Sequence, residues 1–190
     1  MPLFMPLFVL ILAAGGLSSP NPIKADPAQP IYAALNGAWV GALEYRDYSN
    51  NSRVVLPTIL DIQQRAGTAE LSLHYIYDDG PTKVVQDTEI VTVNVATATY
   101  TVVSDGGKQT DKDSLVGTAA FLKVGAGTLV RSGTGKENGK PVDVRTTMTI
   151  SPGSLTILKE TRVVGGAYQF RDQYQLVRVK PASSRASIGK

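Results

Sequence analysis

The 190-residue chain contains no cysteine, and this absence removes several classes of protein at once. Without thiols the chain cannot form a disulfide scaffold, a thiolate metal site, a cysteine nucleophile or a lipid-modified N-terminal cysteine. Its stability must therefore come from a hydrophobic core. A domain of about 165 residues buries roughly 70% of the surface of its unfolded chain, which makes such a core feasible.

Histidine is nearly absent as well, since His74 is the only one in the chain. One histidine among scattered carboxylates is a poor basis for a metal site, and we predict neither a metal nor a cofactor. His74 alternates with Ser72 and Ile76, so we expect it on one face of a sheet. A catalytic triad assembled from distant positions stays open, but no local nucleophile motif supports one.

The chain also lacks a strong charge imbalance, with 19 Lys and Arg against 16 Asp and Glu and a formal net charge of +3. No basic stripe interleaved with aromatic residues occurs, so we do not expect nucleic-acid binding. Lys180, Arg185 and Lys190 give the C-terminal tail a mildly basic character. We interpret them as a solvated tail, with an anionic membrane surface as the alternative partner.

Only one long apolar run is present, at residues 1–16. Its length is typical of the apolar region of a signal peptide and is short for a membrane-spanning helix. We therefore predict a signal peptide at 1–16, cleaved within its small residues or as late as 25, and a secreted or periplasmic protein. A retained N-terminal anchor is the alternative. After removal of this leader, no segment is long and apolar enough to span a bilayer.

The rest of the chain divides by composition into three parts. Residues 17–30 carry four prolines and read as an extended leader or linker. Residues 31–180 are predicted to form one β-barrel domain, which begins with a helical turn at Ile31 to Leu35 before the first strand. Residues 181–190 are small and polar, and we predict a disordered tail.

Within the predicted domain the hydrophobic period is two, and glycine-rich turns recur at intervals of about eight to twelve residues. Asp105-Gly106-Gly107 and Asn138-Gly139 supply the positive φ angles that tight hairpins require. No helical run is long enough to cross over a parallel sheet. We predict an all-β fold, a single antiparallel up-and-down (meander) barrel of about eight to ten strands. The expected strands are 38–47, 54–64, 69–77, 83–94, 97–104, 114–122, 127–133, 142–150, 154–163 and 168–179.

Gly37-Ala38-Trp39 opens the first of these strands and resembles the start of the lipocalin-like (calycin) barrels. The resemblance implies that the tryptophan closes the barrel floor and that an arginine from the last strand packs over its ring. Arg178 is the matching residue here, so we assign barrel closure to Gly37, Trp39 and Arg178. Haem-binding relatives need a histidine near the C-terminal end, and this chain departs from that pattern. The segment from Leu43 to Tyr48 is also similar to the opening of secreted bacterial barrel proteins, a likeness that implies no activity.

Alternation along the strands assigns a set of residues to the barrel interior. Tyrosines on this face could line a cavity or could pack against one another and fill it. Asp47 and Asp172 are expected near the barrel mouth as possible polar contacts to a ligand. The residues predicted to line a cavity are Leu43, Tyr45, Leu73, Tyr75, Tyr100, Met148, Phe170 and Tyr174.

These observations favour a monomeric, exported barrel that binds a small apolar or amphipathic molecule without covalent chemistry. One alternative is a structural or interaction protein of the cell envelope with a filled barrel. The other is a barrel enzyme, an isomerase or hydrolase, which would be favoured if Asp47 and Asp172 faced one pocket within hydrogen-bonding reach of a tyrosine and disfavoured if both were exposed to water. No residue is assigned a catalytic role, and we favour a binding protein over an enzyme.

Overall fold

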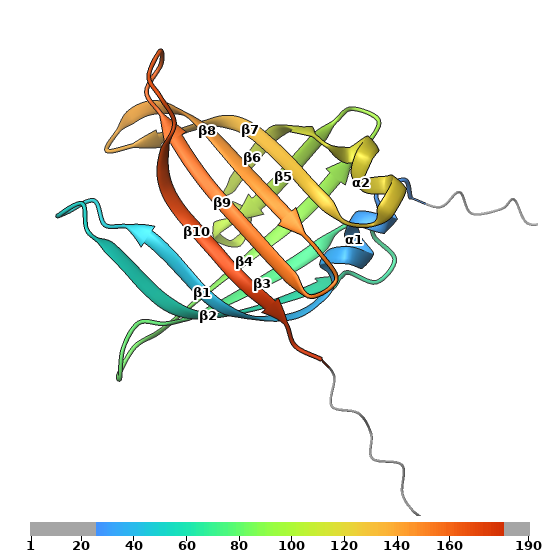
Figure 1. The fold of residues 1–190 in the computed structure, drawn as a ribbon, viewed down its shortest axis with the longest axis horizontal. Coiled ribbons are helices and arrows are strands. Elements are labelled where there is room, and N and C mark those ends of the chain that lie inside the picture. The colour runs from blue at the N-terminus through green and yellow to red at the C-terminus, as the bar shows by residue number, and fades with distance from the viewer. Residues whose placement is uncertain (1–25, 181–190) are drawn as a thin grey trace, which may run out of the picture.

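The computed structural model describes residues 26–180, which form a closed barrel of ten antiparallel strands (Figure 1). Each strand pairs with the next along the chain, and the first pairs with the last. This confirms the predicted all-β, up-and-down barrel. The predicted signal peptide, most of the predicted linker and the predicted tail lie outside the described residues. The strands are β1 (Gly37–Arg46), β2 (Arg53–Gln64), β3 (Leu71–Asp78), β4 (Val84–Asn94), β5 (Thr99–Ser104), β6 (Gln109–Val116), β7 (Gly127–Glu137), β8 (Lys140–Ile150), β9 (Ser154–Arg162) and β10 (Gln169–Arg178).

Three short helical segments accompany the barrel: α1 (Gln29–Leu35), the 3-10 turn η1 (Asp105–Gly107) and α2 (Thr118–Val124). Helices α1 and α2 lie at the same end of the barrel (Figure 1). We refer to this end as the floor and to the opposite end as the mouth. Within residues 26–180, neither α-helix is long and apolar enough to cross a membrane.

The sequence-based prediction was wrong around β6 and α2. We predicted a strand over 114–122, whereas β6 ends at Val116 and the chain turns into α2. Gly117 makes this change of direction with a φ of 93°, and a Cβ there would lie 2.3 Å from the carbonyl oxygen of Thr128. The first half of β6 was missed because residues 109–113 are all polar and show no apolar alternation.

Helix α1 plugs the floor because it turns its apolar residues into the barrel. Ile31, Tyr32 and Leu35 are buried. The Tyr32 hydroxyl donates to the carbonyl of Ala69 at 2.9 Å and accepts from the backbone N–H of Val93 at 3.0 Å. These bonds tie the plug to the β2–β3 connection and to β4, so the floor is closed by directional contacts as well as by apolar burial.

Trp39 and Arg178, which were expected to meet at the floor, are in contact there. Trp39 is fully buried and donates its indole N–H to the carbonyl of Leu35 at 2.9 Å. The Arg178 guanidinium lies 4.0 Å from the Trp39 ring centroid, within the range of a cation–π interaction. The same guanidinium donates to three backbone carbonyls, those of Ala34, Asn36 and Pro152.

Gly37 makes room for this arrangement. Its φ of 127° is a conformation that disfavours other residues, and a Cβ would lie 2.8 Å from a terminal nitrogen of Arg178. The glycine at the start of β1 is therefore required by both the backbone and the arginine beside it.

Replacing Arg178 by methionine should destabilise the barrel by about 2 kcal/mol, because the cation–π contact is lost and three carbonyls lose their donor. The measurement is the free energy of unfolding from urea denaturation. Arg162→Met is the matched control, since Arg162 pairs with Asp143 on a partly exposed surface. That substitution should cost clearly less, because Arg162 is partly solvent-exposed and donates to no backbone carbonyl. Equal losses in the two variants would contradict a special role for Arg178.

Candidate functional site

The middle of the barrel is occupied by packed tyrosines. Tyr75 stacks on Tyr77 with ring centroids 5.9 Å apart, and Tyr174 packs against Tyr75 at 5.5 Å. The hydroxyls of Tyr77 and Tyr174 are hydrogen-bonded at 2.8 Å. Burial raises the pKa of Tyr77 to about 12 and also raises the pKa values of Tyr75 and Tyr174, so these groups stay neutral. This layer is an apolar filling with internal hydrogen bonds.

Most residues predicted to line a cavity belong to the packed interior instead. Leu73, Tyr75, Tyr100 and Met148 are buried in the hydrophobic core. Leu43 and Tyr45 on β1 and Tyr174 on β10 are partly buried. None of the eight predicted residues borders the polar cavity at the mouth of the barrel, which is described below.

Phe170 requires a correction, because the structure places it on the opposite face from the one we predicted. A β-bulge interrupts the pairing of β10 with β9 between Phe170 and Asp172. Phe170 is consequently aligned with Glu160, and its ring packs under the guanidinium of Arg53 at 3.4 Å. A bulge places two residues opposite one and reverses the alternation beyond it, which a strict period of two does not anticipate.

The cavity lies at the mouth of the barrel and has a volume of about 280 Å³. Its walls come mainly from β4 to β10, and Tyr48 from the β1–β2 turn contributes one edge. The surface is mostly polar, with a few valines. Its charged residues are Glu89, Asp111, Asp113, Arg131, Lys136, Glu137, Lys159 and Arg171.

Two glycines on the inner face of β7 shape this region: Gly135 borders the cavity, and Gly133 makes room for the carboxylate of Asp113. Gly133 and Gly135 lie between Arg131 and Glu137 on the same face of the strand. A Cβ at Gly133 would lie 1.9 Å from a carboxylate oxygen of Asp113, and a Cβ at Gly135 would lie 3.2 Å from Val144. In the sequence Arg-Ser-Gly-Thr-Gly-Lys-Glu (131–137), two glycines at a spacing of two fall on one face of a strand, which could have indicated open space beside that face. We missed it because the predicted strand ended at 133.

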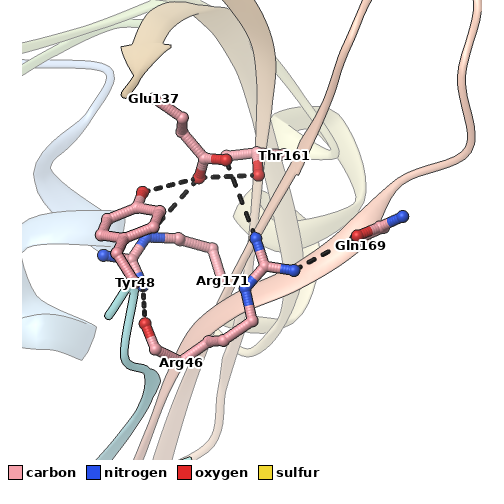
Figure 2. Close-up of polar contacts among 6 residues, drawn as sticks. All are labelled: Arg46, Tyr48, Glu137, Thr161, Gln169 and Arg171. Carbon is pink, nitrogen blue, oxygen red and sulfur yellow. Dashed lines mark hydrogen bonds and ion pairs between the residues drawn. The ribbon is translucent and has the colours of Figure 1, made fainter. Parts of the chain in front are cut away.

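Glu137 is the centre of a polar cluster across the mouth, shown in Figure 2. Its carboxylate accepts hydrogen bonds from the hydroxyls of Tyr48 and Thr161, both at 2.9 Å. It also forms ion pairs with Arg171 at 3.5 Å and Arg46 at 3.8 Å. One carboxylate therefore joins the β1–β2 turn to β7, β9 and β10.

Arg171 strengthens the same cluster from β10. Its guanidinium lies 3.9 Å from the Tyr48 ring centroid and donates to the carbonyl of Arg46 at 2.6 Å. Arg46 in turn donates to the side chain of Gln169 at 3.2 Å. These contacts hold Tyr48 over one side of the mouth and leave the cations of this cluster engaged within the protein (Figure 2).

The two aspartates predicted as ligand contacts are in different settings. Asp47 lies in the β1–β2 turn, where its carboxylate accepts from the backbone N–H and hydroxyl of Ser49, both at 2.7 Å. The backbone hydrogen bond from Ser49 is the main reason why the pKa of Asp47 is lowered. Asp172 lies on β10 opposite Lys159, and burial raises its pKa. Asp47 is thus held in an exposed turn, whereas Asp172 lies on the inner side of β10.

Deeper in the cavity, acidic and basic groups approach one another without close pairing. Burial raises the pKa values of Glu89 and Asp113, and nearby Arg131 opposes the rise in both. The Arg131 guanidinium lies 3.7 Å from Asp113 and 4.8 Å from the Tyr100 ring centroid. Its Nε atom is buried without a hydrogen-bond partner.

Metal binding has no visible basis in residues 26–180, where no group of three or more His, Asp or Glu side chains is arranged around a common point. His74 contacts Gln86 at 3.2 Å in an exposed position, away from the cavity.

Comparison with known proteins gives a match in structure but not in sequence. The sequence matches no protein-family model and no curated protein. The fold is similar to that of the S-type phycobiliprotein lyase CPES from Guillardia theta, with a TM-score of 0.56 and 8% sequence identity. The similarity covers 81% of this chain and 93% of the lyase chain. The chain thus shares a barrel fold with this lyase.

Replacing Glu89 by glutamine should change how stability depends on pH. Because the folded-state pKa of Glu89 is raised, its contribution to stability is present below about pH 4.5 and is lost as the pH rises through the folded value. The variant avoids this loss, so its advantage over the wild type should grow between pH 4 and pH 7. Urea denaturation across that range measures the difference. Glu44→Gln, on an exposed outer surface, is the control; a pH-independent effect of Glu89→Gln would contradict the prediction.

Proposed function

We propose that this protein binds a small amphipathic molecule non-covalently in the mouth cavity. The observation that carries the proposal is an inward-facing space of about 280 Å³ whose walls combine charged groups with valines. Val102, Val142 and Val144 offer apolar contact to the body of a ligand, while the charged side chains can orient a polar group. The inward glycines support the same idea, since larger residues would occupy this space.

The tyrosine layer refines the chemistry that we expect of the ligand. A purely apolar molecule would need the middle of the barrel, and that region is already packed. The mouth cavity instead favours a molecule with a polar group and a small apolar part. The similarity to a phycobiliprotein lyase is compatible with binding of a small molecule, but at 8% identity it concerns the fold and carries no ligand or reaction to this chain.

We also propose that the protein is exported and acts as a monomer, in a secreted or periplasmic location. The support for export is the apolar run at residues 1–16, and the support for a monomer is that the barrel closes on itself. The second candidate function is that of an envelope protein with a filled barrel. The packed tyrosines favour it, and the mouth cavity argues against it.

Gly135→Val should abolish ligand retention, because the added side chain projects into the cavity near Val144. Native mass spectrometry of the protein purified from its own source would reveal a retained ligand as a mass increment. Ser132→Val is the matched control, since it adds the same side chain at an exposed position of the same strand. We expect the increment in the wild type and the control, and its loss in Gly135→Val. Equal retention by both variants, or no increment in the wild type, would contradict the proposal.

A further inference from the structure

Three inward residues on neighbouring strands form a continuous row in the cavity wall. Arg131 on β7 is paired with Thr146 on β8, and Thr146 is paired with Lys159 on β9. All three border the mouth cavity. Strands in a sheet are about 4.8 Å apart, so the two cations start from backbone positions roughly 10 Å apart, with a hydroxyl between them.

The hydrogen-bonding capacity of this row is largely unused. Arg131 Nε is buried and has no acceptor. Among residues 26–180, Lys159 has no ion pair within 4 Å. Arg171 differs, because Glu137 and the carbonyl of Arg46 already engage its guanidinium. Within residues 26–180, Lys136 at the cavity rim also has no ion pair within 4 Å, but its side chain is on β7 outside the row formed by Arg131, Thr146 and Lys159.

Nearby carboxyl groups do not take up these donors. Asp172 is the register partner of Lys159, yet the two form no ion pair. Asp113 forms an ion pair of 3.7 Å with Arg131 Nε but no hydrogen bond, and Glu89 accepts a long contact of 3.5 Å from the Tyr75 hydroxyl. Burial raises the pKa values of all three carboxyls, and the nearby cations oppose the rise.

We infer that the cavity recognises its ligand through a carboxylate, which lies over Thr146 between the side chains of Arg131 and Lys159. This inference rests on the proposed function and specifies the chemical class of the ligand. A carboxylate suits the row because it can accept from a guanidinium, an ammonium and a hydroxyl at once. The small apolar body of the ligand would then lie against the valines of the cavity wall.

The test uses pairs of fluorinated acids and their primary amides, which have nearly the same shape but differ in charge. Suitable acids are 4-fluorobenzoate, 4-fluorophenylacetate and 3-(4-fluorophenyl)propionate. Titration followed by fluorine NMR gives the affinity of each member for the wild-type protein. We expect at least one acid to bind about tenfold or more tightly than its amide.

Single-residue variants then show which side chains cause the preference for the acid over the amide. Lys159→Met and Arg131→Met should each weaken binding of the acid about tenfold and leave binding of the amide within about twofold. Lys112→Met is the control, because Lys112 is an exposed residue of β6 outside the cavity, and it should change neither affinity.

The outcomes separate the two proposals. Equal binding of acid and amide that is abolished by Gly135→Val would overturn the carboxylate inference and support the cavity as a ligand site. Acid selectivity that persists in both cation variants would also overturn the inference. Absence of binding by every acid and amide would overturn the proposed function together with the inference.

Discussion

The contact between Arg178 and Trp39 is the interaction on which the rest of the structure depends. It joins the last strand to the first, where an up-and-down barrel must close. The same guanidinium reaches carbonyls of α1 and of the β8–β9 turn, so one side chain secures the plug, the seam and a neighbouring hairpin. With the floor fixed in this way, the mouth cavity lies at the opposite end of the barrel.

The interior of an eight-stranded barrel is just filled by its own side chains, and a barrel of ten strands is wider. This protein uses that space in layers. Trp39 and α1 close the floor, packed tyrosines fill the middle, and charged residues surround a cavity at the mouth. Polar groups that are costly to bury far from water are kept where water or a ligand can reach them. The layering explains why the cavity is polar although the core below it is not.

Sequence alone predicted much of the fold because a period of two and glycine turns are local features. Trp39 and Arg178 could be related by parity across the seam. The mouth could not be predicted in the same way: the polar first half of β6 has no apolar alternation, and the bulge before Asp172 reverses the face of Phe170. Gly133 and Gly135 have meaning only beside Asp113 and Val144, which are distant in sequence. The cavity depends on how distant strands are aligned with one another, and this alignment is not visible in a local sequence pattern.

The location of the ligand site at the charged mouth is tested most directly by NMR chemical-shift mapping with 3-(4-fluorophenyl)propionate. Backbone amide shifts should change most along the inner rows of β7, β8 and β9, around Arg131, Thr146 and Lys159. The tyrosine layer around Tyr75 and Tyr174 should change little, because it is already packed. Shifts centred on that layer, with the mouth unaffected, would contradict a ligand site at the mouth and return the binding function to the apolar interior.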